Sequence, residues 1–347
     1  EGVCELWFVT KTKSSKRPQV GPFYFFTFLT MEYFVYKNKL GNKKVNDHER
    51  GAVSYRTAKA RDIGAINALY HQEYGREYPS FVTVKSFNSP EISVIVVVDA
   101  ADSVVGVGQI TRLKHTHGSY ELNGLVVSPA YRGYKIGKLL LEKRIRMLQN
   151  KRARIAYSEP VCREKECRSQ HNLTRAGFAL TGILPLKYPD ELVTANQPES
   201  VGIGVLNMTN GNHTPGSRPL YVPEEYRAVV ATVLKINTPA SAPRGPMPQV
   251  VEVPALVAEG RSGSSFVEIP INWSGSESVI TQWRNKRYLF AGILAGVRLN
   301  SLGEPYDVLV LYKPPSGVRV NFSFIHVLPE LRQLHQFCRE EYMSRYH

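Results

Sequence analysis

Two hydrophobic periods alternate along residues 52–210, and together they predict strands interrupted by helices. Runs of β-branched residues such as ISVIVVV (residues 92–98) are typical of strands, whereas apolar residues that recur every three or four positions indicate amphipathic helices. The predicted strands are residues 53–57, 92–98, 104–113, 119–127, 154–157, 178–184 and 201–208, and the predicted helices are residues 58–74, 135–149 and 164–176. We expect the strand at residues 201–208 to close the sheet.

The predicted helix at residues 135–149 has one apolar face and one basic face. Its inward positions are Ile136, Leu139, Leu140 and Ile145, and its outward positions are Lys138, Lys143, Arg144 and Arg146. Such a helix packs its apolar face on a sheet and leaves its charges in water.

A second set of elements follows two turn-rich connectors at residues 210–219 and 237–248. Further helices are predicted at residues 223–236, 278–286 and 328–345, and strands at residues 250–257 and 266–271 and in the apolar runs near 290 and 309. The run Gly292-Ile-Leu echoes Gly182-Ile-Leu in the first part of the chain, although two short apolar strings can also match by chance. Residues 213–347 are therefore predicted to form a second, smaller α+β domain, and 347 residues suffice for two domains.

The stretch LVVSPAYRGYKIGKLLL (residues 125–141) is the most informative in the chain. It predicts a strand, a break at Ser128-Pro129, a basic glycine loop and a helix that begins near Tyr134. A helix start exposes unpaired backbone N–H groups and the positive end of the helix dipole, so it attracts anions. A Walker loop needs a longer gap between its glycines and then Lys-Ser/Thr, and a dinucleotide fingerprint needs three glycines. Gly133 and Gly137 fit neither pattern.

At Arg132-Gly133-Tyr134-Lys135-Ile136-Gly137 the sequence resembles the GNAT family of acyl-CoA-dependent N-acyltransferases. The signature of that family is Arg/Gln-x-x-Gly-x-Gly/Ala after a strand that ends in Val-x-Pro, and here Lys135 replaces the middle glycine. A later Gly177-Phe178 also falls in the family's order. The resemblance covers residues 52–210. It implies an α+β fold with a mixed central sheet flanked by helices in a domain at residues 51–212, and it suggests a degenerate GNAT-like half at residues 213–347.

The resemblance also implies where an acyl-CoA, acetyl-CoA in the first instance, would bind. The pantetheine arm would lie beside Val126 and Val127, and a backbone N–H of this strand would meet the charge on the thioester oxygen. The residues expected to hold the pyrophosphate are Arg132, Gly133, Tyr134, Lys135, Ile136, Gly137 and Lys138.

The reaction of an amine with a thioester requires a base. An amine with a pKa of about 10.4 must lose a proton near pH 7, which costs roughly 4–5 kcal/mol. A carboxylate in the acceptor groove can take that proton. Glu121 lies eight residues before Pro129, where many GNAT members carry their base, and a solvent-facing strand carboxylate is the alternative interpretation.

The proton donor for the leaving thiolate is less evident. The family often places a tyrosine four residues before the Gly-Phe pair, and this position is Leu173. An asparagine usual further upstream corresponds to Glu166. Candidates for the missing donor are Tyr157, Ser169 and His171, each of which has packing or capping as its alternative role.

The charge and the cysteine content of the chain indicate its partners and its compartment. The formal net charge of +14 favours anionic partners such as CoA phosphates, nucleic acid or acidic membranes, and solvated surface is the alternative explanation for much of it. Four cysteines are too few for a disulfide framework, so we expect a reducing cytoplasm. Cys162 and Cys167 have no further Cys or His at ligand-like spacing, so no metal site is expected.

Residues 1–50 are predicted to be a poorly ordered extension. The aromatic segment at residues 21–36 is too short for a membrane span and contains Glu32. A natural start at Met31 is one interpretation, and an arm that lies on a membrane is the other.

The sequence thus predicts a cytoplasmic N-acetyltransferase that moves an acyl group to a primary amine by direct attack. A non-catalytic acyl-CoA-binding regulatory module is the alternative, because the catalytic half of the signature is incomplete. Nucleic-acid binding is disfavoured, because aromatic residues do not interleave with a basic face. The sequence does not identify the acceptor amine, and it leaves open whether the protein forms a homodimer.

Overall fold

The computed structural model of the chain describes residues 53–75, 82–113, 116, 118–163, 165–188, 199–209, 219–235, 256–259, 264–300 and 304–346. The predictions for residues 1–50, for most of both connectors and for the start of the strand at residues 250–257 concern positions outside these ranges.

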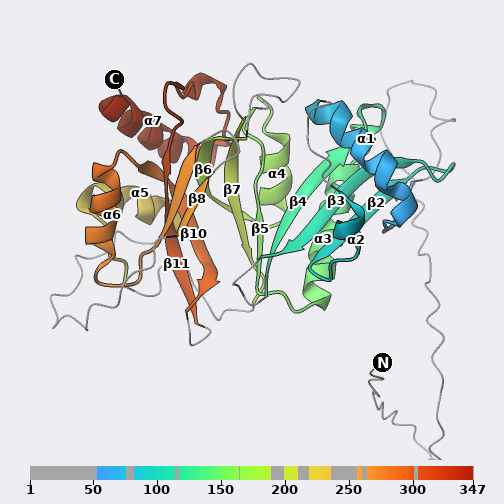
Figure 1. Cartoon of the computed structure of the whole chain (residues 1–347), viewed down its shortest axis with the longest axis horizontal. Coiled ribbons are helices and arrows are strands. Elements are labelled where there is room, and N and C mark those ends of the chain that lie inside the picture. The colour runs from blue at the N-terminus through green and yellow to red at the C-terminus, as the bar shows by residue number, and fades with distance from the viewer. Residues whose placement is uncertain are drawn as a thin grey trace, which may run out of the picture. The chain divides into compact units, whose positions relative to one another are not determined.

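The described strands form one sheet of eleven strands (Figure 1). Their bounds are β1 (Ser54–Thr57), β2 (Ile92–Val98), β3 (Val104–Arg112), β4 (Ser119–Val127), β5 (Ile155–Ser158), β6 (Ala179–Tyr188), β7 (Glu199–Asn207), β8 (Leu256–Glu259), β9 (Ser265–Pro270), β10 (Leu289–Leu299) and β11 (Pro305–Lys313). Their order across the sheet is β1-β2-β3-β4-β5-β7-β6-β10-β11-β9-β8. The pair β4 and β5 is parallel, and the other neighbouring pairs are antiparallel.

Helices cover both faces of this mixed sheet. Their bounds are α1 (Ile63–Tyr74), α2 (Val84–Phe87), α3 (Ile136–Asn150), α4 (Arg168–Arg175), α5 (Glu224–Leu234), α6 (Ser276–Asn285) and α7 (Arg332–Tyr346), with single 3-10 turns η1 (Ala60–Asp62), η2 (Pro129–Tyr131), η3 (Phe322–Phe324) and η4 (Pro329–Leu331). Helix α1 packs Ile66 on Val96 of β2, whereas α3 packs Leu140 on Val97 of the same strand. Because neighbouring strand residues point to opposite faces, α1 and α3 lie on opposite sides of the sheet. The predicted α+β fold is confirmed.

Arg144 contradicts the pattern expected for α3. The helical spacing predicts an outward side chain, yet Arg144 is only 2% exposed. Its guanidinium donates hydrogen bonds to the backbone carbonyls of Gln109 and Asn123, at 3.1 and 3.0 Å. A buried charge needs such partners, and periodicity along a single helix cannot reveal acceptors that a sheet supplies.

The prediction that the strand at residues 201–208 closes the sheet is wrong. Strand β7 lies between β5 and β6, and β6 continues the sheet by pairing with β10 at Gly182 and Gly292. A Cβ atom on Gly182 would lie 2.9 Å from the Cα of Gly292, and one on Gly292 would lie 2.3 Å from the Cα of Gly182. The two backbones approach this closely because neither residue carries a side chain.

A shared core joins the parts of the chain on either side of the first connector. Ile183 and Val201 belong to the same buried cluster as Phe290, Leu309 and Leu334. The boundary between residues 212 and 213 lies outside the described residues, so the division into two domains stays a prediction. Within the described residues, no helix combines the length and the apolar character that crossing a membrane requires.

Candidate functional site

The candidate site lies where β4 separates from β5. The two parallel strands pair at Ser119, Tyr120 and Glu121, the last of which faces Tyr157 across the pair. The pairing ends there, while β4 continues to Val127. Beyond Leu122, whose carbonyl accepts a hydrogen bond from the Ser158 hydroxyl of β5 at 2.8 Å, β4 therefore has a backbone edge that β5 does not use. An edge of this kind accepts an extended ligand as an additional strand.

A β-bulge interrupts β4 on this free half. Val126 pairs with Val107 and Asn123 pairs with Gln109, so Gly124 and Leu125 together face Gly108 of β3. A bulge leaves one residue outside the hydrogen-bonding ladder and turns its backbone groups in a new direction. The backbone groups of Gly124 and Leu125 thus depart from the regular ladder on the half of β4 with which β5 does not pair.

The basic glycine loop connects the end of β4 to the start of α3. Helix α3 begins at Ile136, and its N-cap residue Lys135 has the left-handed conformation with φ 60° and ψ 16°. No side chain caps this terminus in the described part of the chain, and the first turn of α3 contains no acidic residue. The first N–H groups of the helix thus remain available to an anion.

The predicted phosphate-binding residues gather at this terminus, with two differences. Gly133, Tyr134, Lys135 and Lys138 are exposed, whereas Ile136 is buried in the core between α3 and the sheet. The side chain of Arg132 is engaged elsewhere, because its guanidinium is paired with Glu73 of α1 and also donates to the Val127 carbonyl at 3.3 Å. An arriving phosphate would compete with Glu73 for this guanidinium.

The left-handed backbone of Lys135 leads to a prediction about stability. An L-residue with a side chain loses roughly 1–2 kcal/mol in this conformation. We expect Lys135→Gly to leave the free energy of unfolding unchanged or to raise it by up to about 1 kcal/mol, because the strain is relieved while the unfolded chain gains freedom. Lys138→Gly, within the first turn of the same helix, should instead lower it by about 1 kcal/mol. Thermal unfolding of both variants tests this, and equal losses at the two positions would contradict it.

Glu121 is a half-buried carboxylate at the point where the strands part. Burial, reinforced by the negative charge of Glu159, raises the pKa of Glu121 to about 7. The ammonium of Lys187 and a hydrogen bond from Asn123 oppose this rise without cancelling it. A carboxylate with a pKa near 7 exchanges a proton readily at neutral pH, which is the property required of a general base.

Glu159 organises the polar groups around Glu121. The hydroxyl of Tyr157 donates to Glu159 at 2.5 Å, the hydroxyl of Tyr188 donates at 2.8 Å, and Lys187 forms an ion pair with the same carboxylate. Burial acts to raise the pKa of Glu159, but Lys187 and the two hydroxyls outweigh it and hold that pKa below its usual value. Glu159 therefore stays ionised, and its charge helps to keep the pKa of Glu121 high.

The sequence interpretation did not identify Glu159, Lys187 or Tyr188. A weak signal for Glu159 was present, because it lies two residues beyond Tyr157 and directly follows the end of β5. The two residues on β6 carried no such signal, because only the pairing of β6 next to β7 brings them near β5.

Comparison with known families decides what kind of domain this site belongs to. Residues 63–178 match the sequence model of the acetyltransferase (GNAT) family. The chain contains a GNAT domain. A search of curated proteins finds no match for the chain.

Several solved structures resemble part of the chain. The ribosomal-protein-S18-alanine N-acetyltransferase of Escherichia coli is 18% identical over 46% of this chain and 97% of its own, with a TM-score of 0.37. A putative GNAT acetyltransferase of Desulfovibrio desulfuricans is 17% identical over 46% of this chain and 100% of its own, with a TM-score of 0.35. The spermidine N-acetyltransferase of Vibrio cholerae, solved with CoA and spermine, is 15% identical over 45% of this chain and 95% of its own, with a TM-score of 0.36.

The GNAT domain departs from the family pattern at α4. Leu173, at the position usual for the tyrosine, is 4% exposed and packs with Phe178 in the core beneath α3. Its neighbour Asn172 faces the start of α3, because a Cβ atom on Gly137 would lie 3.8 Å from the Asn172 Nδ2 atom. Asn172 is thus a polar residue beside the glycine loop that sequence reasoning missed.

The other proposed proton donors on α4 lie in ordinary surroundings. The hydroxyl of Ser169 donates to the Val161 carbonyl at 3.3 Å, and His171 is exposed. Among the described residues no cluster of His, Cys, Asp or Glu has an arrangement suited to a metal ion, and Cys162 and Cys167 are buried.

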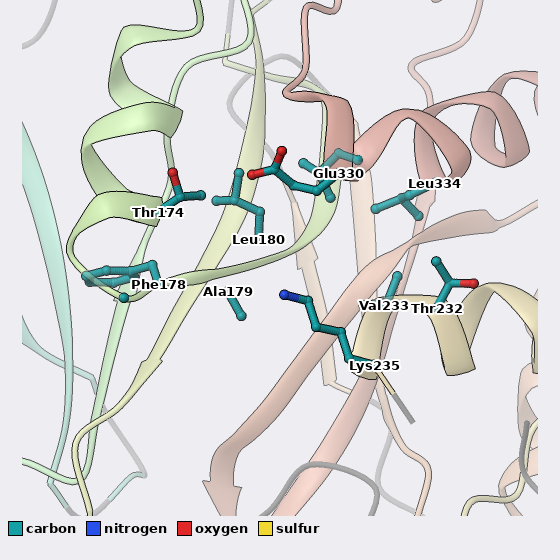
Figure 2. A pocket seen from close by; sticks show the side chains of 11 residues that line it. Thr174, Phe178, Ala179, Leu180, Thr232, Val233, Lys235, Glu330 and Leu334 are labelled. Atoms are coloured by element: carbon teal, nitrogen blue, oxygen red, sulfur yellow. The ribbon is translucent and has the colours of Figure 1, made fainter. Parts of the chain in front are cut away.

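A separate hollow of about 310 Å³ opens between the ends of α4 and α5 and the turn η4. Figure 2 shows the side chains of Lys235 and Glu330 on opposite sides of this space. Neither Glu121 nor any residue of the glycine loop lines it. We place the candidate site where β4 and β5 separate instead, because Glu121, the bulge and the uncapped start of α3 follow closely along the chain there.

Proposed function

We propose that the chain is an N-acyltransferase that moves the acyl group of an acyl-CoA, acetyl-CoA in the first instance, to a primary amine by direct attack. One observation carries this proposal. Glu121 at the end of the pairing between β4 and β5, the bulge at Gly124 and the uncapped start of α3 follow one another along the chain. Under this proposal the base, the N–H donors and the anion-binding helix start lie in the same order as the groups that they would meet. These groups are the attacking amine, the thioester and the pyrophosphate of the bound acyl-CoA.

Binding would begin at the glycine loop. The pyrophosphate would accept hydrogen bonds from the first N–H groups of α3, with Lys135 and Lys138 supplying positive charge nearby. The pantetheine arm would then lie along the backbone at Val126 and Val127, on the edge of β4 that β5 leaves free.

Chemistry would follow at the other end of the gap. Glu121 would take the proton of the incoming ammonium, directly or through water, and so supply the neutral amine that attack requires. Negative charge that develops on the thioester oxygen would be met by N–H groups of the bulge. The departing group is the CoA thiolate, which carries the electron pair of the broken carbon–sulfur bond.

Tyr157 stays a prediction as proton donor to that thiolate. Its hydroxyl is held by Glu159, and burial together with the Glu159 charge raises the pKa of Tyr157 well above its ordinary value. A thiol has a pKa of about 8.5, so a proton would move from Tyr157 to the thiolate only against a free-energy difference. Protonation of the thiolate from solvent after release needs no such step.

The proposal is tested by binding and turnover. Calorimetric titration of the full chain with acetyl-CoA should give one site per chain, because residues 213–347 contain no second Arg-Gly-x-x-x-Gly sequence. Acetyl-CoA offered with a panel of polyamines, amino acids and peptides should release free thiol with at least one amine. A chain that binds no CoA would refute the proposal.

A non-catalytic acyl-CoA-binding module is the second candidate. The buried Leu173 favours it, because an apolar core residue stands where the family often has its proton donor. Binding of acetyl-CoA without thiol release from any amine in the panel would support this candidate. A cytoplasmic location and a homodimer stay predictions from the sequence.

A further inference from the structure

Arg144 is a buried cation with no carboxylate paired to it among the described residues. Its Nη1 atom donates to the carbonyls of Gln109 and Asn123, and its Nε atom donates to the Leu140 carbonyl at 3.3 Å. Gly108 leaves room for it, because a Cβ atom there would lie 3.1 Å from Nε. Burial lowers the pKa of Arg144 to about 10, which still leaves the guanidinium charged at neutral pH.

The position of this cation is set by the bulge. Gln109 and Asn123 are the register pair next to the two bulge residues of β4, and one atom of Arg144 donates to a carbonyl from each strand. The guanidinium thus occupies the place where the bulge interrupts the ladder. An arginine suits this place, because a charged donor makes stronger hydrogen bonds than a neutral one.

On the opposite face of the sheet from Arg144, the side chain of Tyr70 of α1 binds the carbonyl of the next residue of β4. Its hydroxyl donates to the Gly124 carbonyl at 2.5 Å, and its side chain is 1% exposed. The carbonyls of Asn123 and Gly124, which are consecutive in the bulge, are therefore each bound by a side chain.

These two contacts bear on the N–H groups of the bulge. The C=O of Asn123 and the N–H of Gly124 belong to one planar trans peptide, so they point in opposite directions. Arg144 holds the Asn123 carbonyl, so the Gly124 N–H points away from the guanidinium, on the half of β4 with which β5 does not pair. The Gly124 carbonyl and the Leu125 N–H likewise belong to one peptide and point in opposite directions, so the Leu125 N–H points away from the Tyr70 hydroxyl. A hydrogen bond to the carbonyl polarises the peptide and strengthens its N–H as a donor.

Resting on the proposed function, we infer that Tyr70 and Arg144 are positioning residues that fix and polarise the bulge N–H groups against the thioester oxygen. They touch neither substrate nor cofactor in this arrangement. They affect the direction and strength of the Gly124 and Leu125 N–H donors. Their loss should therefore change the carbonyl stretching frequency of the bound acyl group as well as kcat.

Tyr70→Phe removes one hydroxyl and keeps the ring. The rate constant kcat should fall about 3- to 10-fold, the range expected for one lost hydrogen bond, while the dissociation constant of CoA changes less than twofold. Difference infrared spectroscopy of bound acetyl-CoA labelled at the thioester carbonyl should show a stretch at higher frequency than in the wild type. Arg144→Met should shift it in the same direction, provided that circular dichroism and CoA affinity show an intact fold.

Tyr55→Phe is the matched control. Its hydroxyl accepts a hydrogen bond from Lys143 at 3.1 Å on β1, away from the bulge, so its loss should move neither kcat nor the carbonyl frequency. An unchanged frequency and kcat in Tyr70→Phe, in a protein whose wild type binds acetyl-CoA, would overturn the inference and leave the proposed function standing. A wild type that binds no acetyl-CoA would overturn both.

Discussion

Gly137→Asp should lower the affinity for CoA by about 100-fold or more, which corresponds to about 2.7 kcal/mol. Gly137 is the second residue of α3, so an aspartate there places a carboxylate among the N–H groups proposed to bind the pyrophosphate. The fold should survive the change. A Cβ atom at this position meets Leu125 at 3.7 Å and Asn172 at 3.8 Å, which are ordinary contacts, and a negative charge at a helix start is favourable to the helix.

Calorimetric titration with CoA measures this effect, and thermal unfolding verifies the fold. Gly137→Ala is the control, because it adds the Cβ without the charge and alanine is a residue that the GNAT signature accepts at this position. Its affinity should stay within a few-fold of the wild type. If Gly137→Asp bound CoA as tightly as Gly137→Ala, the pyrophosphate would not lie on the start of α3.

Glu121→Gln should lower the rate of acyl transfer by roughly 10²- to 10⁴-fold near pH 7.5, the range expected for loss of a general base. The amide keeps the shape of the carboxylate but cannot take a proton, so CoA binding should be unchanged. The wild-type rate should rise with pH through the Glu121 pKa of about 7, and the variant should lack this rise. Its deficit should shrink at high pH, where the amine loses its proton without help.

The measurement is the pH profile of thiol release from acetyl-CoA with the best amine of the panel. Glu91→Gln, which changes an exposed carboxylate paired with Arg112, is the control and should follow the wild type. A Glu121→Gln variant as fast as the wild type across the whole range would mean that Glu121 does not act as the general base.

The same substitution should change the pH dependence of stability. The folded-state pKa of Glu121 is raised from 4.5 to about 7, so its contribution to stability is complete below pH 4.5 and is lost as the pH rises through 7. Glutamine has no such loss. The free energy of unfolding of the variant should therefore increase relative to the wild type between pH 4.5 and 7, by at most about 3 kcal/mol, and level off above pH 7.

The sequence alone determined much of the local structure. The predicted strands at residues 92–98 and 119–127 agree with β2 and β4 to the residue, and the helix after the glycine loop begins within two residues of its predicted start. These features depend on near neighbours along the chain, such as β-branched runs, the break at Ser128-Pro129 and apolar spacing. The family resemblance read from the loop was confirmed for the same reason, because its residues are contiguous.

Only the tertiary structure decided how distant segments meet. The segments that carry Gly182 and Gly292 were recognised as similar, but their pairing with each other, which extends the sheet beyond β6, was not predicted. The order on the two sides of that contact is mirrored, since β5, β7 and β6 are followed by β10, β11 and β9. Register between segments a hundred residues apart leaves no periodic trace in either one.

The candidate site also combines features that the sequence predicted with features that only the tertiary structure decided. Sequence proposed Glu121 and the glycine loop, but the high pKa of Glu121 depends on Glu159 and on burial, and the bulge depends on β3. Arg144 was assigned to the wrong face, because its helix offered a basic stripe while its partners are carbonyls of β3 and β4. Local sequence determines which backbone groups form regular structure. The electrostatic environment of a side chain is set by groups from several elements, and these come together only when the whole sheet is assembled.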